Sequence, residues 1–273
     1  MAIRSYTPPV SERYTHGHHD TLLATYGRRT ADEAAAFLLP HLSPGSRIVD
    51  VGCGPGSITA GLAAAVAPGD VIGIDESLTS IARARGEHRR LENLSFVVGS
   101  AYQLPVGDAG VDIAYAHQVL QHLARPVAAL REMGRVLRSG GLVAVRDADY
   151  GTMIHWPHEP MIDRWLELYH ATQRHHGGEP DAGRRLLAWV DRAGFRETAV
   201  TTSSWVFADA EARTAWSEMW VDRLVPGRPY GELAAERTSR AELDEIIAAW
   251  RRWAERPDGL FAFLNVEVLA RRP

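Results

Sequence analysis

The sequence predicts an α/β protein with a doubly wound, mostly parallel, seven-stranded sheet and helical cap additions. Two observations predict this class. From residue 47 onward, short apolar runs alternate with helical stretches, which is typical of a parallel sheet covered by helices on both faces. The first apolar run, Ile48–Val51, leads through the glycine-rich turn 52–56 directly into an alanine-rich helix.

The individual elements follow from the same alternation. Strands are predicted at 47–51, 71–75, 95–99, 111–116, 141–147, 197–207 and 260–269. Helices are predicted at 31–39, 57–66, 77–86, 124–137, 158–176, 182–192, 209–224 and 232–255. The pair Gly140-Gly141 indicates a helix stop and a turn into the fifth strand.

The chain is expected to divide into three parts. Residues 1–45 are predicted to form an N-terminal helical lid, and residues 46–150 the ligand-binding core of the sheet. Residues 151–273 complete the sheet and carry helical insertions at about 151–180 and 208–257, which we expect to cap a substrate.

All eight tryptophans lie between residues 156 and 253, within this last part. Ligands of open parallel sheets bind beyond the carboxyl ends of the strands, where the added helices can cover them. Trp156, Trp216 and Trp220 are therefore candidates for an apolar substrate pocket. The packing of helices is the expected role of the tryptophans Trp165, Trp189, Trp250 and Trp253.

The turn after the first strand has the spacing G-x-G-x-G, with glycine at 52, 54 and 56. Glycine lets the backbone turn sharply and lets a ligand lie against it, while the following helix N-terminus presents free N–H groups. The dinucleotide fingerprint G-x-G-x-x-G would need glycine where this chain has Ser57. The second strand ends at Asp75, where a carboxylate can accept both hydroxyls of a ribose, which suits S-adenosylmethionine (SAM) and NAD alike.

The composition excludes several enzyme classes, because all 30 basic residues are arginine. P-loop proteins, kinases and pyridoxal enzymes each need a lysine, and so do short-chain dehydrogenases, which share this βα layout. An excess of arginine and alanine without lysine suggests a GC-rich, bacterial genome. The net charge of −4 offers no reason to expect a nucleic-acid partner.

Cysteine usage and hydropathy bear on the compartment. The single cysteine, Cys53, permits no internal disulfide and fits a reducing environment. The sequence contains neither an apolar run long enough to span a membrane nor an N-terminal signal core, so we expect a cytoplasmic protein without membrane partners.

Several motifs in order resemble the class I SAM-dependent methyltransferases, closest to the small-molecule group related to ubiquinone/menaquinone-biosynthesis C-methyltransferases. The matching segments are VDVGCGPG at 49–56, GID at 73–75, GSAYQLP at 99–105, VDI at 111–113, VLQH at 119–122 and EMGRVLRSGG at 132–141. The resemblance covers roughly residues 12–205. It implies that residues 46–150 are a SAM-binding core and that the substrate is a small-molecule methyl acceptor.

The resemblance also implies roles in cofactor binding. Gly52, Gly54 and Gly56 would hold the methionine part of SAM, with Asp50 orienting the turn. The other implied contacts are Asp75 to the ribose, Glu76 beside the adenosine, Ser100, Ala101 and Tyr102 around the adenine, and His117 and Gln118 near the sulfonium and methionine amine. Many relatives have Asp in place of Ser100. In the N-terminal part, Tyr14, His18 and Arg29 resemble residues that close over SAM, and Arg29 could pair with the methionine carboxylate.

Methyl transfer needs a base only when the acceptor must lose a proton. His122, after the fourth strand, is the first candidate, and Asp149, at the end of the fifth, is the second. The run HGHHD at 16–20 is not expected to bind a metal, because adjacent histidines point in different directions.

Three functions remain open at this point. The first is a SAM-dependent methyltransferase acting on an O, N or C atom of a small, partly apolar metabolite. The second is a SAM-binding protein of the same fold that catalyses a non-methylating reaction such as cyclisation. The third is a nicotinamide-dependent oxidoreductase, which Ser57 and the absence of lysine oppose. Homodimer formation is left undecided.

Overall fold

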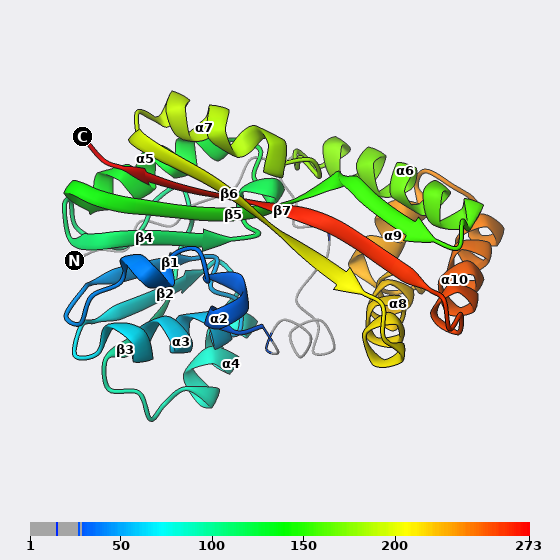
Figure 1. Cartoon of the computed structure of the whole chain (residues 1–273), viewed down its shortest axis with the longest axis horizontal. Helices are drawn as coiled ribbons and strands as arrows, with labels where there is room; N and C mark the ends of the chain where they lie inside the picture. Colours follow the sequence, from blue (N-terminus) through cyan, green and yellow to red (C-terminus); the bar gives the residue numbers. More distant parts are fainter. Residues whose placement is uncertain (1–14, 16–26, 28) are drawn as a thin grey trace.

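A seven-stranded sheet with strand order β3-β2-β1-β4-β5-β7-β6 forms the centre of the molecule (Figure 1). The computed structural model describes Thr15, Gly27 and residues 29–273. The strands are β1 (Ile48–Val51), β2 (Val71–Asp75), β3 (Leu94–Val98), β4 (Val111–His117), β5 (Leu137–Trp156), β6 (Arg196–Phe207) and β7 (Leu260–Arg271). The pairings among β1 to β5 are parallel, whereas β7 runs antiparallel to both β5 and β6. The predicted fold class is confirmed.

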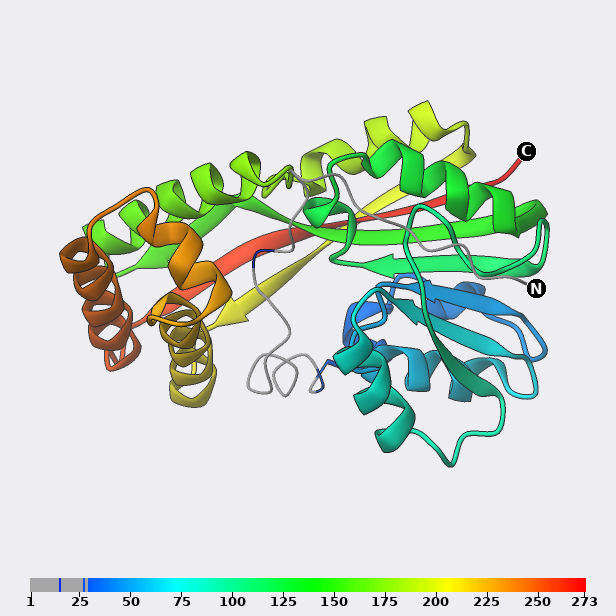
Figure 2. The same ribbon diagram turned by 180° about the vertical axis from the view of Figure 1, so that it is seen from behind.

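Helices cover both faces of the sheet (Figures 1 and 2). They are α2 (Ala31–Ala34), α3 (Ser57–Val66) and α4 (Leu78–Glu87) on one face, and α5 (Pro126–Val136) and α7 (Leu186–Ala193) on the other. Successive strand residues point to opposite faces. Ile48 therefore joins the core beneath α3 with Leu62, whereas its neighbour Val49 joins the core beneath α5 with Leu130.

The strands β5, β6 and β7 continue past the rest of the sheet as a long ribbon (Figure 1). Four helices pack at its far end: α6 (Pro160–His175), α8 (Ala210–Leu224), α9 (Pro229–Ala235) and α10 (Arg240–Ala254). Their shared core is aromatic and includes Trp165, Trp220, Trp250 and Phe261. The indole of Trp165 lies 4.4 Å from that of Trp220 and 5.0 Å from that of Trp250, measured between ring centroids.

The fifth strand is much longer than the predicted 141–147. Gly140 lies within it, with a φ of +72° as a turn would have, but its N–H donates to the carbonyl of Arg272 at 2.9 Å, so pairing continues. Beyond Asp149 the register with β7 shifts, and pairing resumes from Ile154 to Trp156. The extension depends on a partner strand more than a hundred residues away, which local sequence does not reveal.

Two helix predictions also need correction. The predicted helix 31–39 is only α2 followed by a turn and the 3₁₀ segment Leu39–His41. The predicted helix 232–255 is two helices, because Pro229 starts α9 and the hydroxyl of Ser239 accepts the Glu242 N–H at 3.1 Å to cap α10. Among the described residues, none of the helices combines the length and the apolarity needed to cross a bilayer.

Candidate active site

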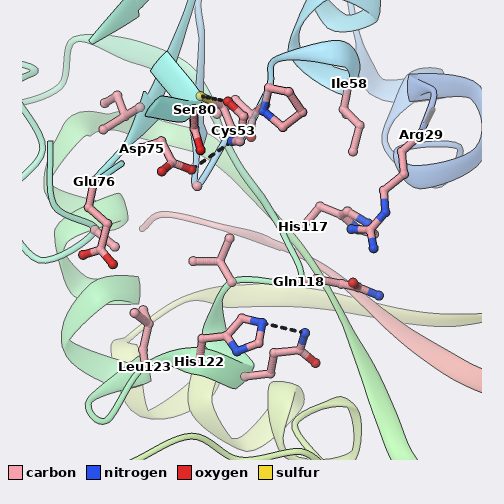
Figure 3. A pocket seen from close by; sticks show the side chains of 18 of the residues that line it. Arg29, Cys53, Ile58, Asp75, Glu76, Ser80, His117, Gln118, His122 and Leu123 are labelled. Carbon is pink, nitrogen blue, oxygen red and sulfur yellow. Dashed lines mark hydrogen bonds between the residues drawn. The ribbon is translucent and has the colours of Figure 1, made fainter. Parts of the chain in front are cut away.

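One cavity opens at the carboxyl ends of β1, β2 and β4 and continues toward β5, β6 and α8 (Figure 3). It brings together most of the residues expected to bind a cofactor. The predicted residues that line it are Arg29, Asp50, Gly52, Gly54, Asp75, Glu76, Ser100, Ala101, Tyr102, His117, Gln118 and His122. Tyr14 and His18 lie outside the described residues.

The glycine turn places bare backbone at the cavity wall. Gly54 has a φ of +54°, and a Cβ added there would meet no atom within 4 Å, so the main chain is open to a ligand. Gly52 has a φ of +72°, and a Cβ there would lie 2.4 Å from a methyl of Val119. Gly56 does not line the cavity; it precedes α3 and packs against Phe96. A side chain at 52 would therefore clash with the protein, and one at 54 would occupy ligand space.

Two carboxylates shape the turn. Asp50 is buried in β1 and accepts the hydroxyl proton of Thr59 at 2.7 Å. Burial raises the pKa of Asp50 to about 7, although the Thr59 hydrogen bond opposes the rise. Asp75 accepts the N–H groups of Gly54 and Ser77, each at 2.9 Å and each on a different oxygen. A carboxylate oxygen has more than one acceptor site, so Asp75 keeps capacity for ligand hydroxyls.

The loop after β3 forms another part of the wall. The Ser100 hydroxyl accepts the backbone N–H of Tyr102 at 3.2 Å and retains its own proton for a further partner. The guanidinium of Arg125 lies 4.6 Å from the centroid of the Tyr102 ring, and the Arg125 N–H donates to the Tyr102 hydroxyl at 3.2 Å. These contacts hold the Tyr102 ring beside the cavity.

At the end of β4, His117 is held as one tautomer of the neutral imidazole. Nη1 of the buried Arg146 lies 3.3 Å from Nδ1 of His117, and a guanidinium can only donate. His117 Nδ1 must then be the acceptor, and the neutral ring carries its proton on Nε2. Burial and, secondarily, the charges of Arg29 and Arg146 hold the pKa of His117 well below its usual range. His117 thus presents an N–H donor, and that Nε2 has no hydrogen-bond partner among the described residues.

Arg146 is itself positioned by a network of hydrogen-bonded side chains from three strands. Its Nε donates to Glu267 on β7 at 3.2 Å, and its Nη2 donates to the Ser203 hydroxyl on β6 at 3.0 Å. The Ser203 hydroxyl in turn donates to Glu267 at 2.5 Å. Because each member is bonded, this buried ion pair is satisfied and fixes the orientation of the His117 ring. The sequence did not predict this network, because its residues are far apart in the chain.

Gln118 follows His117 with a φ of +54°, which is unusual for a residue with a side chain. Its N–H donates to the carbonyl of Arg146 at 2.7 Å, and its side-chain amide donates to Asn265 at 3.3 Å. Backbone strain of this kind persists where surrounding contacts enforce it and clusters at functional sites. Here it directs the chain from the strand end along the cavity.

The two candidate bases are in different places. His122 lines the cavity in the 3₁₀ segment Leu120–His122, and its Nε2 lies 3.1 Å from the side-chain nitrogen of Gln121 (Figure 3). Asp149 does not line the cavity. It is 2% exposed, and both of its oxygens accept from the Arg184 guanidinium, at 2.5 and 2.7 Å. The expectation of Asp149 as a base is therefore corrected: its lone pairs serve a structural ion pair.

Of the three tryptophans predicted to line a substrate pocket, the structure places one at the cavity. Trp216 lines the cavity as predicted, but Trp220 lies in the aromatic core and Trp156 is 61% exposed, away from the cavity. Trp205 lines the cavity and was not singled out from the sequence; the Arg29 guanidinium lies 5.0 Å from its ring centroid. As expected, Trp165, Trp189, Trp250 and Trp253 are buried among apolar side chains.

In the described part of the chain, one group of side chains has metal-ligand spacing. It consists of His155, His158 and Asp163, whose ligand atoms lie within 4.8 Å of one another near the start of α6. His158 and Asp163 are exposed, and none of the three lines the cavity.

Comparison with known proteins identifies the family. A family model described as a methyltransferase domain matches residues 42–194. The chain belongs to the methyltransferase family. An uncharacterised methyltransferase of Schizosaccharomyces pombe is 34% identical over 271 residues, and the match covers 95% of this chain and 96% of the S. pombe protein. A "probable methyltransferase ltbC" of Aspergillus luteorubrus is 30% identical over 280 residues, covering 95% and 97%.

Solved structures of low sequence identity share the fold of this methyltransferase. A phosphoethanolamine N-methyltransferase of Haemonchus contortus, solved with SAM, has a TM-score of 0.60 at 16% identity and covers 96% of this chain and 59% of its own. The [4+2]-cyclase SpnF has a TM-score of 0.51 at 24% identity, with 90% and 85% covered. The two full-length relatives above are fungal, so the bacterial origin stays a prediction.

SAM is the cofactor of this methyltransferase, and the residues at the cavity fit it. Gly54 offers an open main chain, and the cavity is also lined by the carboxyl groups of Asp50, Asp75 and Glu76, of which Asp75 and Glu76 supply negative charge for a cationic ligand. Those three carboxylates lie at the end of the cavity formed by the first two strands. The polar end of the cavity, beside the glycine turn, is therefore the end that fits SAM.

Proposed function

We propose that this methyltransferase transfers the methyl group of SAM to an O, N or C atom of a small, partly apolar metabolite. The observation that carries the proposal is the continuity of the cavity. It runs from the glycine turn to a wall formed by Tyr150, Trp205 and Trp216, so that a cofactor and an apolar acceptor share one space. Its aromatic end suits an acceptor with an apolar body.

We assign the cofactor contacts to the residues that the cavity brings together. The turn 52–56 holds the methionine part, with Asp50 fixing the shape of the turn through Thr59. Asp75 accepts from the ribose hydroxyls and Glu76 flanks the adenosine. The adenine lies against Ser100, Ala101 and Tyr102, and His117 and Gln118 lie near the sulfonium and the methionine amine, with Arg29 pairing the methionine carboxylate. Apart from Gly56, the residues assigned to contact the cofactor all line the cavity, which supports the assignment.

Methyl transfer from SAM requires little of the protein beyond alignment of the acceptor with the methyl group. SAM, when bound, supplies a methyl group that is already activated by its positively charged sulfur. The protein orients the acceptor in line with the breaking bond and excludes water from it. The described walls on the acceptor side are aromatic, with Tyr150, Trp205 and Trp216 among them, which serves both purposes.

We assign His122 as the base for acceptors that must lose a proton. Its ring lines the cavity, and its Nε2 lies 3.1 Å from the side-chain NH2 of Gln121, which must release Nε2 before that atom can take a proton from an acceptor. A base positioned in this way contributes about a hundredfold or more to the rate. With an identified acceptor, His122→Asn should lower kcat and leave the affinity for S-adenosylhomocysteine (SAH) unchanged. An unchanged kcat would remove His122 from the mechanism.

The direct test is a screen of candidate metabolites with purified protein and SAM carrying a deuterated methyl group. Mass spectrometry would follow SAH and the labelled acceptor together. Formation of both in equal amount supports methyl transfer. A changed metabolite without SAH would instead indicate a non-methylating reaction such as cyclisation, and failure of SAM and SAH to bind in calorimetry would contradict the whole proposal.

The division of the chain stays part of this proposal. We assign residues 1–45, of which the structure describes Thr15, Gly27 and residues 29–45, as a lid over the cofactor. Residues 46–150 are assigned as the SAM-binding core, and the helices of about 151–180 and 208–257 as a cap over the acceptor. Trp216 and Met219, which reach the cavity from α8, support the capping role. The single cysteine is buried and free, which supports a cytoplasmic location.

A further inference from the structure

The 3₁₀ segment Leu120–His122 brings two polar side chains together at the cavity wall. Gln121 and His122 both line the cavity, and Gln121 is only 4% exposed. The amide nitrogen of Gln121 lies 3.1 Å from Nε2 of His122, a contact that the dashed line from His122 marks in Figure 3. The proposed base therefore has a polar neighbour to which the cofactor contacts give no role.

The main chain of Gln121 is held by two distant segments. Its N–H donates to Oδ1 of Asp147 on β5 at 3.2 Å, and its carbonyl accepts the N–H of Glu179 at 2.8 Å. A Cβ at Gly178 would lie 2.9 Å from the same carbonyl, so the chain that follows α6 packs closely against it. These contacts keep the Gln121 amide beside the His122 ring.

The two polar atoms of the Gln121 amide have different surroundings. The nitrogen contacts His122, whereas the oxygen is buried and has no hydrogen-bond partner among the described residues. Half a turn about the terminal torsion exchanges these two atoms within nearly the same volume. In the described part of the chain, this rotation would break no side-chain hydrogen bond of Gln121 except the one to His122.

Each orientation of the amide fits one protonation state of His122. The amide nitrogen can only donate, so in the observed orientation Nε2 accepts and the neutral ring carries its proton on Nδ1. The amide oxygen can only accept, so after rotation it pairs with an Nε2 that carries a proton. A glutamine can therefore bond both the neutral imidazole and the imidazolium at the same atom.

We propose that Gln121 is a positioning residue for His122, whose amide rotates when His122 gains or loses a proton. The inference rests on the proposed role of His122 as the base. An acceptor displaces the Gln121 NH2 and gives its proton to Nε2; its freed electron pair bonds the methyl carbon, and the electrons of the C–S bond stay on the sulfur of SAH. The Gln121 oxygen then accepts from Nε2–H until that proton passes to water.

Other ionisable groups near this pair are the same whichever way the amide points. Asp147 accepts the N–H of Gln121. The ionisable side chains that line the same cavity include Asp75, Glu76, His117, Arg29 and Arg223. Because substitutions at position 121 leave all of these groups in place, a comparison among such variants isolates the effect of the amide on His122.

An NMR titration of the ligand-free, full-length protein with isotope-labelled histidine tests the proposal without an acceptor. The spectrum of His122→Asn identifies the His122 signals. At high pH the ring should be the Nδ1–H tautomer, because the Gln121 NH2 donates to Nε2. The pKa measured for His122 should be no lower in the wild type than in Gln121→Met, because the rotated oxygen also bonds the imidazolium. An amide fixed with its NH2 on Nε2 would instead make the wild-type pKa lower by about 0.5–1.

Two further variants locate the effect. Gln121→Glu should raise the pKa of His122 by about 1 or more, because a carboxylate only accepts and its charge favours the imidazolium. The matched control is Gln173→Met. Gln173 is also a buried glutamine, but its amide donates to the Thr15 hydroxyl at 2.5 Å and it does not line the cavity. The control should keep the wild-type tautomer and pKa of His122.

Three results would overturn the proposal: an Nε2–H tautomer at high pH, a wild-type pKa below that of Gln121→Met, or no rise of the pKa in Gln121→Glu. If Gln121→Met does not fold, nuclear Overhauser effects in the wild type decide. Those from the Gln121 amide protons to the His122 ring protons should weaken when the ring is protonated, and unchanged effects contradict the rotation. The proposed function is tested separately, by SAH calorimetry and by kcat of His122→Asn, so its failure is distinguishable from a failure of this inference.

Discussion

The two ends of the sheet bury very different side chains. Around β1 to β3 the core is mostly small and aliphatic, with residues such as Leu62, Ala63 and Ala84 beside the ring of Phe96, and the backbone itself reaches the cavity. Around the extensions of β5 and β7 the core is a cluster of indole and phenyl rings, with Trp165 fully buried at its centre.

This difference separates two physical tasks. Small residues let the main chain approach a ligand closely, so the first region binds through N–H groups and carboxylates. Large rings bury much apolar area per residue, so the second region contributes stability and supplies an apolar wall. The comparison predicts that substitutions in the aromatic region lower stability, whereas substitutions at the glycine turn lower cofactor affinity.

The largest expected effect is on stability, from Trp165→Ala. Removing a fully buried indole that contacts Trp220 and Trp250 should lower the free energy of unfolding by about 3–5 kcal/mol. Chemical denaturation followed by circular dichroism measures the loss. The affinity for SAH, measured by calorimetry well below the melting temperature, should stay near that of the wild type. A large loss of affinity in the folded variant would contradict the division of tasks.

The next effect is on affinity, from Asp75→Ala. Loss of hydrogen bonds to a charged carboxylate should weaken SAM and SAH binding about 10- to 100-fold, which corresponds to about 1.5–3 kcal/mol. Calorimetry with SAH provides the measurement. Asp108→Ala is the control, since Asp108 is an exposed aspartate that does not line the cavity. Equal affinities in wild type and Asp75→Ala would remove Asp75 from the cofactor site.

A smaller effect is the pH dependence of stability due to Asp50. Burial raises its pKa to about 7 from the ordinary 3.8, so between these values the folded chain holds a proton that the unfolded chain releases. This contribution to stability therefore decreases as pH rises from about 4 to about 7 and is constant above that. Asp147, whose pKa burial raises to about 8, adds a similar dependence.

Asp50→Asn should make the stability of the ligand-free protein fall less steeply over that range, because the replacement does not titrate. Urea midpoints measured across this pH range, with the exposed Asp70 replaced in Asp70→Asn as a surface control, give the comparison. The outcome against this account is an Asp50→Asn slope equal to that of the wild type.

The smallest effect is expected at Trp156, where the aromatic region meets solvent. Its side chain is 61% exposed, and the Trp253 indole bonds to its backbone carbonyl, which any residue supplies. Trp156→Ala should therefore change the free energy of unfolding by no more than about 0.5 kcal/mol. A loss as large as that of Trp165→Ala would show that tryptophan content, and not burial, accounts for the contribution of this region.

Local patterns were enough to predict the cofactor region. The apolar run at β1, the turn at 52–56 and Asp75 at the end of β2 are consecutive features whose geometry depends on neighbouring residues, and all of them reach one cavity. The family followed from the same short segments. Such features can be predicted because the geometry of glycine turns, strand ends and helix starts depends on only a few neighbouring residues.

The acceptor end depended on contacts between distant parts of the chain. Asp149 looked available at a strand end, but Arg184, 35 residues later, occupies its oxygens. The proton position on His117 is set by Arg146, which is held by Glu267 on another strand, and Arg223 reaches the cavity only because α8 packs on the extended ribbon. Burial and pairing of this kind arise when the chain folds upon itself, so no local pattern in the sequence records them.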